Sequence, residues 1–254
     1  MEFIVYIILT ALLWVIALTV FLPFTALLKY SKTFRNKWFP FIYVYGVLFL
    51  FGRYTRPFRK RCFEMLKENL PNRSKSKCIK ILEIGIGSGA NLPFYPENSA
   101  LTSVDVNPSF REYFFKNRSR YPHIEYERAI TCMAEDMSEI EDSSMDVVVT
   151  SYVLCYVNDI RAVLCEIRRV LKPDGKYLYM EHFAFPRKNW GYLVQKLIAP
   201  LWFIYSDGCC IDRDIPNEIR KAGFSNIVCE EKYPFSIPLC VRPHVLGIAT
   251  VCKN

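Results

Sequence analysis

The stretch Ile81-Leu82-Glu83-Ile84-Gly85-Ile86-Gly87-Ser88-Gly89 decides the fold of this chain. Its aliphatic start predicts a short buried strand, and the three alternate glycines predict a tight turn directly after it. Glycine is needed where the backbone takes a positive φ or where a ligand comes too close for a Cβ atom. The spacing departs from the G-x-G-x-x-G turn that binds dinucleotides. Glu83, just before the first glycine, would repel a diphosphate but suits a cationic ligand.

A second acidic residue follows about twenty positions later, at the end of the next predicted strand. Asp105 stands where nucleotide-binding sheets hydrogen-bond ribose hydroxyls, and Asn107 comes two residues after it. The glycines alone are equally compatible with a turn that binds nothing. Together with Glu83 and Asp105 they predict a site for a cationic nucleoside, which favours S-adenosylmethionine over NAD.

Strand and helix patterns alternate through the rest of the chain. This alternation predicts an α/β fold with a doubly wound, Rossmann-like parallel sheet, whose ligand crevice lies at the carboxyl ends of the strands. The predicted strands cover residues 79–84, 101–105, 124–130, 145–150, 176–182, 224–230 and 245–251. Four predicted helices cover 57–70, 108–119, 158–171 and 215–222, and a further helix is predicted to begin near Ala90. A long apolar stretch over 189–205 is predicted to be a lid or a second membrane-contacting helix.

The N-terminal segment is strongly apolar. Phe3 to Leu22 contains no charged residue, and twenty residues of helix span about 30 Å, enough to cross a bilayer. The start, Met1-Glu2, lacks the basic region of a secretory signal, and no small-residue cleavage site follows. We therefore expect a membrane-anchoring helix within residues 1–28, with a buried core helix as the alternative.

Positive charge is concentrated after this segment. Between Lys29 and Lys80 there are 14 Lys and Arg against two Glu, which predicts that the following domain faces the cytosol. Aromatic and apolar residues interleave with these charges over 38–51, which favours membrane lipids over nucleic acid as the partner. Residues 29–77 are thus predicted to form a membrane-interface segment with a basic collar over 53–61 and a polar linker over 72–77.

Ten cysteines are scattered along the chain. They form no C-x-x-C pair and have no histidine at the spacing typical of zinc ligands. The simplest interpretation is a set of reduced thiols that pack as small hydrophobic side chains, with no metal.

The glycine motif with Glu83 and Asp105 resembles motif I and the following acidic position of class I S-adenosylmethionine-dependent methyltransferases. The similarity continues through Asp146–Ser151 and through Ile167–Gly175, the helix and turn before the fifth strand. A narrower likeness, to the membrane-anchored thiol S-methyltransferases of the methyltransferase-like group, rests on the N-terminal apolar segment and on Lys37-Trp38-Phe39-Pro40, Met180-Glu181-His182, Asp207-Gly208-Cys209 and Val241-Arg242-Pro243-His244.

The resemblance implies that residues 78–254 form a methyltransferase domain with S-adenosylmethionine as cofactor. It implies that the glycines admit the methionine part, that Asp105 and Asn107 hold the ribose, and that Ala134 and Glu135 contact adenine. Met133 departs from the acidic residue that many relatives carry. The implied cofactor-binding set is Glu83, Gly85, Gly87, Gly89, Asp105, Asn107, Ala134, Glu135 and Ser151.

The narrower likeness implies a small lipophilic thiol as acceptor, at the endoplasmic reticulum or on lipid droplets. A thiol is only slightly ionised at neutral pH, so a base would help, and His182 is the candidate. The alternative for His182 is a structural histidine at the end of a strand, bonded to a backbone carbonyl. The candidate substrate pocket consists of Tyr152, Tyr156, Asp207, Arg242 and His244. A structural ion pair between Asp207 and Arg213 is the alternative for that segment.

Two other functions stay open at this point. An apolar lid and a basic collar would equally suit an O- or C-methyltransferase that acts on a lipid or a quinone-like acceptor. A non-catalytic protein of the membrane or lipid-droplet surface is the other alternative, and Met133 is the feature that favours it.

Overall fold

The computed structural model describes residues 2–70 and 78–252. A seven-stranded sheet forms its centre, in the order β3-β2-β1-β4-β5-β7-β6. β7 runs antiparallel to both of its neighbours, and the first five strands of this order are parallel. The strands are β1 (Ile79–Ile84), β2 (Ser99–Val104), β3 (Glu125–Ile130), β4 (Met145–Ser151), β5 (Leu171–His182), β6 (Asn226–Lys232) and β7 (His244–Thr250). The predicted α/β class is confirmed, with one antiparallel strand in an otherwise parallel sheet.

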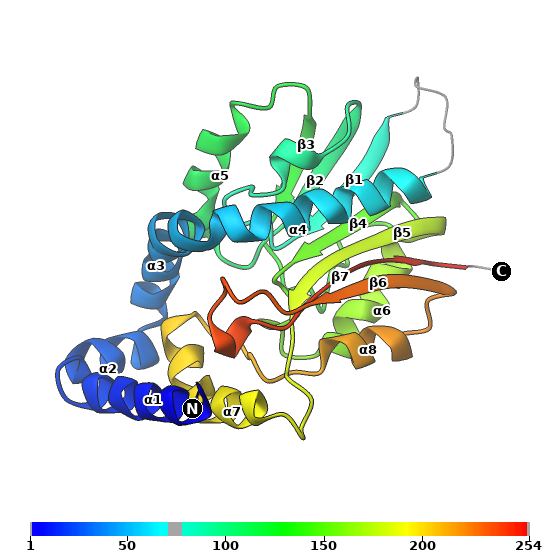
Figure 1. The fold of residues 1–254 in the computed structure, drawn as a ribbon. Helices are drawn as coiled ribbons and strands as arrows, with labels where there is room; N and C mark the ends of the chain where they lie inside the picture. Colours follow the sequence, from blue (N-terminus) through cyan, green and yellow to red (C-terminus); the bar gives the residue numbers. More distant parts are fainter. Residues whose placement is uncertain (1, 71–77, 253–254) are drawn as a thin grey trace.

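Helices cover both faces of the sheet (Figure 1). One face packs against α4 (Leu48–Asn69) and α5 (Arg111–Arg118), the other against α6 (Ile160–Val170) and α8 (Ile215–Lys221). Successive side chains of a strand point to opposite faces, so alternate residues of one strand enter different cores. Leu82 packs on the α6 side and Ile81 on the α4 side. Burial on both faces explains why these strands are almost continuously apolar.

The segment after the glycine turn differs from its prediction. The prediction of a helix that begins near Ala90 is wrong. The chain there forms turns and only a short 3₁₀ helix, η2 (Leu92–Phe94). Pro93 and Pro96 lack the amide hydrogens that an α-helix needs in its interior. The region of 108–119 forms a 3₁₀ turn, η3 (Pro108–Phe110), followed directly by α5. Residues 72–77, predicted as a linker, lie outside the described residues.

The N-terminal helix is shorter than predicted. α1 (Glu2–Leu18) ends before residue 22, and α2 (Leu22–Tyr30) continues at an angle of 82°. Pro23 lies in the first turn of α2, where proline is tolerated, and it has no amide hydrogen to bond the Thr19 carbonyl, so α1 cannot continue through it. No single helix in the described ranges is both long and apolar enough to cross a bilayer, whereas the bent α1–α2 pair passes the same test of length and composition.

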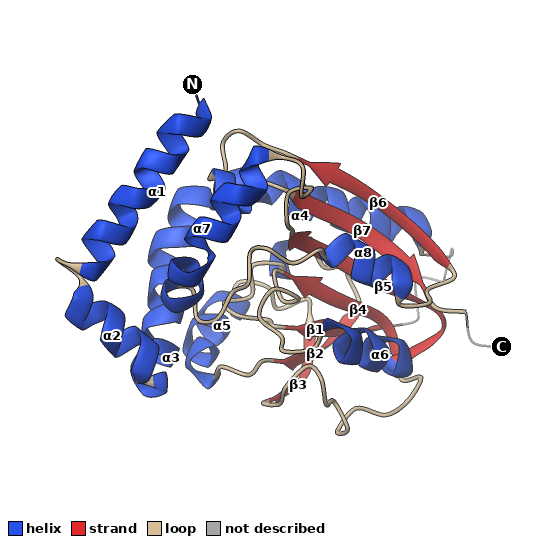
Figure 2. Cartoon of the chain, turned by 90° about the horizontal axis from the view of Figure 1, so that it is seen from below, coloured by secondary structure: helices blue, strands red, loops and turns tan. Residues whose placement is uncertain are grey.

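The helices α1 and α2 lie along α7 (Trp190–Tyr205), and all three stand beside one end of the sheet (Figure 2). Trp14 Nε1 donates to the Leu197 carbonyl oxygen at 2.8 Å, and the hydroxyls of Thr25 and Tyr205 are 2.6 Å apart. From α2 the chain continues through α3 (Lys32–Ile42) and a π-helical turn, η1 (Tyr43–Val47), into α4. The N-terminal helices are therefore packed onto the domain rather than separate from it.

Candidate active site

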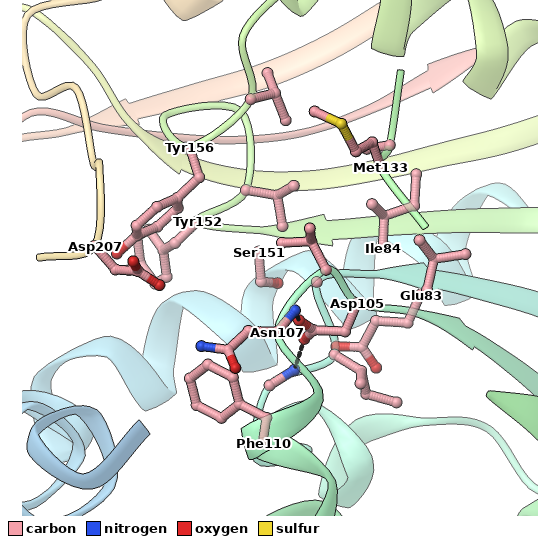
Figure 3. Close-up of a pocket in the computed structure, with 18 of the residues that line it drawn as sticks. Glu83, Ile84, Asp105, Asn107, Phe110, Met133, Ser151, Tyr152, Tyr156 and Asp207 are labelled. Atoms are coloured by element: carbon pink, nitrogen blue, oxygen red, sulfur yellow. Dashed lines mark hydrogen bonds between the residues drawn. The ribbon is translucent and has the colours of Figure 1, made fainter. Parts of the chain in front are cut away.

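A cavity opens at the carboxyl ends of β1, β2 and β4, where the strand order reverses between β1 and β4. Ligands of open parallel sheets bind at such a reversal. The cavity holds about 1020 Å³ of empty space, including its open mouth. Figure 3 shows Glu83, Asp105, Asn107 and Ser151 around it, with Asp207 and Tyr156 on one side and Met133 on another.

The glycine turn forms part of the cavity wall. Gly85 and Gly87 line the cavity, whereas Gly89 does not. All three have positive φ, which glycine adopts at little cost. A Cβ atom on Gly89 would lie 2.5 Å from Leu92 Cδ1, so this glycine is required for packing of the turn. Gly85 is required for packing in the same way, because its Cβ atom would lie 2.5 Å from Val153 Cγ2, whereas Gly87 leaves open backbone beside the cavity.

Glu83 is a buried carboxylate in the cavity wall. It accepts hydrogen bonds from Tyr95 Oη at 2.6 Å and from Asn91 Nδ2 at 2.8 Å. Burial raises the pKa of Glu83 to about 7, and the two hydrogen bonds and the Arg59 charge oppose this rise. The Oδ1 atom of Asn91 is buried and has no hydrogen-bond partner among the described residues. This corner therefore holds two acceptors suited to a cationic ligand.

Asp105 and Asn107 lie at the end of the neighbouring strand β2. Asp105 accepts hydrogen bonds from the amides of Gly87 and Asn107, both at 2.9 Å. Burial raises its pKa, and these hydrogen bonds oppose the rise. Asn107 caps η3 by accepting from the Ser109 amide, and its side-chain amide donates to the Asn36 carbonyl of α3. Asp105 thus fixes the glycine turn while its carboxylate faces the cavity.

The far wall follows β3 and β4. Met133, Ala134 and Glu135 line the cavity together with Ser151. Glu135 accepts from the amides of Asn158 and Asp159, so its carboxylate orders the loop before α6. Ser151 accepts a hydrogen bond from Asn91 Nδ2 at 2.9 Å. Eight of the nine predicted cofactor residues therefore surround one cavity, and Gly89 is the exception.

Aromatic residues from the N-terminal helices close the cavity on another side. Phe39 of α3 and Tyr43 of η1 line it. The Phe39 ring lies 5.9 Å from Phe110 and 5.6 Å from Tyr156, and Tyr43 lies 5.8 Å from Phe110. The sequence predicts only a membrane-interface role for this segment. It contributes directly to the cavity, so the boundary predicted at residue 77 cuts through the site.

Arg59 of α4 is a second cavity residue that the sequence analysis did not identify. Only 5 % of its surface is exposed, so its assignment to a collar for lipid headgroups is wrong. Its Nη1 donates to Thr55 at 2.8 Å, and its Nε has no partner among the described residues. No carboxylate within the described ranges forms a salt bridge with it. Its position in the sequence could have identified Arg59 as buried, because Arg59, Phe63 and Leu66 recur at the spacing of one buried helical face.

Three of the five predicted pocket residues line the cavity, namely Tyr152, Tyr156 and Asp207. Asp207 forms a salt bridge with Arg35 at 2.9 Å, so the alternative pairing with Arg213 is wrong. Arg213 instead donates to backbone carbonyls of the turn after β4.

Arg242 and His244 lie outside the cavity. Arg242 packs over the Phe235 ring and donates to Tyr6 of α1. His244 is buried against Phe58 and Tyr152, with Nδ1 at 2.9 Å from the Arg242 carbonyl. Burial lowers the pKa of His244 to about 4. Both residues support elements next to the cavity.

His182 also lies outside the cavity, behind the ring of Tyr152, which is stacked 6.1 Å away. Its Nε2 atom is 3.2 Å from Cys209 Sγ. The residue before it, Glu181, accepts from the Val153 amide and so holds the turn after β4. Tyr152, in that turn, has a φ of 60°, which is strained for a non-glycine residue.

The strand order, the glycine turn and the acidic strand ends define a class I S-adenosylmethionine-dependent methyltransferase. A family model described as a methyltransferase domain matches residues 82–179. In solved structures the fold is shared, for example, with a methyltransferase from Thermotoga maritima described as a possible histamine N-methyltransferase. That match has a TM-score of 0.53 and 18% identity, and covers 84% of this chain and 99% of the other.

Similarity to curated proteins defines the family more closely. The chain is 35% identical over 237 residues to human thiol S-methyltransferase TMT1B, covering 93% of this chain and 96% of the relative. It is 34% identical over 215 residues to human thiol S-methyltransferase TMT1A, covering 84% of this chain and 86% of the relative. The chain belongs to the family of these thiol S-methyltransferases. Its cofactor is accordingly S-adenosylmethionine.

Proposed function

We propose that the cavity binds S-adenosylmethionine through four separate contacts and transfers its methyl group to a small lipophilic thiol. The observation that carries this proposal is that a buried carboxylate, Glu83, and a buried guanidinium, Arg59, line the same cavity without forming a salt bridge. Glu83 and the free Oδ1 of Asn91 suit the ammonium group of the cofactor, whereas Arg59 suits its carboxylate. Asp105 suits the ribose hydroxyls, and Ala134 and Glu135 stand where the adenine would lie.

Unpartnered polar atoms support this fit. A buried polar group without a hydrogen bond costs free energy, so such atoms in a cavity indicate a missing ligand. Arg59 Nε and Asn91 Oδ1 are two of these atoms, and both residues line the cavity. A cofactor with neighbouring carboxylate and ammonium groups would satisfy both.

The bound cofactor supplies a methyl group that its sulfonium already activates. The chain must therefore align the acceptor with that methyl group and keep water away. Phe39, Tyr43, Phe110 and Tyr156 provide an apolar enclosure that favours a lipophilic acceptor over water.

A carboxylate in the same enclosure can take the proton of the acceptor thiol. Asp207 lines the cavity, and Figure 3 shows it beside Tyr156. Burial raises the pKa of Asp207, and Arg35 opposes the rise. We assign the role of base to Asp207 rather than to His182, because the Tyr152 ring stands between His182 and the cavity.

We further propose that the bent α1–α2 pair and α7 attach the protein to a membrane, with the methyltransferase domain in the cytosol. Lipophilic acceptors concentrate in membranes, so attachment would bring the cavity close to its substrate. The exposed apolar side chains that support this are Ile4, Val5, Ile8, Leu9, Leu12, Leu13, Val15, Leu18, Val20, Phe21 and Leu22, with Leu193, Leu197 and Phe203 of α7.

A transfer assay tests the acceptor class. Purified protein with methyl-labelled S-adenosylmethionine should label a small alkyl thiol and should leave the matching alcohol and phenol unlabelled. Label on phenols or lipids alone would favour the O- or C-methyltransferase alternative. Absence of product on every acceptor, despite measured cofactor binding, would favour the non-catalytic surface protein.

Vesicle flotation tests the attachment. The double variant Ile8→Asp/Leu12→Asp places charge on exposed positions of α1 and should leave the vesicle fraction. Val228→Asp, at an exposed apolar position on β6, is the matched control and should float like the unmodified protein. Flotation of the α1 variant at the unmodified level would contradict the proposed attachment surface.

A further inference from the structure

Three potential metal ligands meet directly behind the cavity. The Sγ atoms of Cys155 and Cys209 and a ring nitrogen of His182 all lie within 4.8 Å of one another. The Cys209 Sγ to His182 Nε2 distance is 3.2 Å. All three residues are buried, with exposed fractions of 0%, 2% and 6% for Cys155, Cys209 and His182. Separate elements supply them, so their proximity is a result of the fold and not of sequence spacing.

The surrounding backbone holds the three ligands in place. Cys155 lies in the turn after β4, and His182 is the last residue of β5. Cys209 follows α7, and the amide of Cys210 donates to the Cys155 carbonyl at 2.9 Å. Sites built on such paired elements lose little freedom when a metal binds.

We propose that Cys155, His182 and Cys209 bind a divalent cation of the zinc class. Two thiolates and one imidazole are a donor set that zinc prefers over harder cations. Zinc bonds of about 2.3 Å to sulfur and about 2.0 Å to nitrogen would fit between these three atoms after small shifts of the side chains. His182 Nε2 faces Cys209 Sγ, and it offers its lone pair to the metal when the ring proton is on Nδ1.

The donor count indicates the type of site. Structural zinc sites have four protein ligands, whereas sites with three leave a position for water or another small ligand. Only three such residues group here within the described ranges. The site would join three segments that build the cavity wall, since Tyr156 follows Cys155, Tyr152 stacks on His182, and Asp207 precedes Cys209 by two residues. A metal would therefore fix the positions of Tyr156 and Asp207.

Metal analysis of the full chain tests this proposal without reference to methyl transfer. Protein purified without chelator should contain about one zinc per chain, and Cys209→Ser and His182→Gln should each reduce that content about tenfold or more. Cys62→Ser is the matched control, because Cys62 is equally buried but lies on the α4 side of the sheet. Equal metal content in the control and in the Cys209 variant would overturn the proposal.

Cobalt substitution provides a second readout that does not depend on folding yield. Chain reconstituted with Co²⁺ should show a thiolate-to-cobalt charge-transfer band, which Cys155→Ser weakens and Cys62→Ser leaves intact. A protein that takes up neither zinc nor cobalt, or that contains a disulfide between Cys155 and Cys209, would contradict the site. Either result would leave the proposed methyl transfer untouched, because the cofactor contacts lie in the cavity.

Discussion

The cavity has a floor made of strand ends and a roof made of N-terminal helices, and these two regions are encoded differently. The floor consists of Glu83, Gly85, Gly87, Asp105 and Ser151, each of which lies in the last two residues of a strand or within three residues after it. The roof consists of Phe39, Tyr43 and Arg59, on helices that carry no recognisable ligand motif. Floor residues are specified by local spacing, whereas roof residues depend on how distant helices pack. A short motif can therefore identify the cofactor, whereas most residues around the acceptor cannot be located from local sequence.

Substitutions in the floor should cause the largest loss of cofactor affinity. Asp105→Ala removes the carboxylate that we propose accepts hydrogen bonds from the ribose hydroxyls, and it should weaken cofactor binding about 100-fold in calorimetry. Because Asp105 also holds the glycine turn, Asp105→Asn is a second variant that keeps the shape and should weaken binding less. Asp142→Ala, an exposed acid that pairs with Arg169, is the control and should bind normally. Unchanged affinity in Asp105→Ala would reject the floor as the cofactor site.

Arg59 tests whether the roof takes part in cofactor binding. Arg59→Met removes the proposed partner of the cofactor carboxylate and should weaken binding about 30-fold, whereas Arg59→Lys should recover part of the loss. Arg56→Met, at an exposed position one turn away, serves as the control. If both methionine variants bind the cofactor equally well, the roof has no part in cofactor recognition.

The pKa of Glu83 predicts how binding depends on pH. Its folded pKa of about 7 lies above the ordinary value, so this group stabilises the ligand-free protein at low pH, and that stabilisation is lost as pH rises through 7. A cationic ligand favours the ionised form, so cofactor affinity should increase about tenfold between pH 6 and pH 8. The measurement is a dissociation constant across this range. Glu83→Gln should remove the slope, and a slope that persists in this variant would assign it to another group.

Phe39 should show the smallest effect, and on the acceptor rather than the cofactor. Phe39→Ala removes aromatic contacts to Phe110 and Tyr156 and should raise KM for the thiol about fivefold. The cofactor affinity of this variant should stay within about twofold of that of the unmodified protein, because the Phe39 ring makes no polar contact. Phe41→Ala, half exposed on the same helix, is the control. An equal loss of cofactor and thiol binding would place Phe39 in a general packing role.

Most of the floor could be predicted from the sequence because its chemistry is local. The strand before Gly85 and the acid at the end of β2 lie within about twenty residues of each other, and parallel strands bring their carboxyl ends together. The order of strands and helices was predictable for the same reason. The helix expected near Ala90 does not form, because Pro93 and Pro96 lack the amide hydrogens that the interior of an α-helix needs.

The parts of the fold and of the site that the sequence did not predict depend on contacts between residues far apart in the chain. Arg59 was grouped with neighbouring arginines, although its helical position places it on the buried face of α4. The cysteines of the proposed metal site are 54 residues apart, so no local spacing could reveal them. The break between α1 and α2 was readable from Pro23, whereas their packing along α7 was not.

The most direct test is a crystal structure of the chain with S-adenosylhomocysteine, the product of the proposed reaction. We expect the ribose hydroxyls within hydrogen-bond distance of Asp105, the ammonium group beside Glu83 and the carboxylate against Arg59. A nucleoside bound elsewhere, or a cavity filled by Phe39 and Tyr152 in the presence of saturating ligand, would contradict the proposed site.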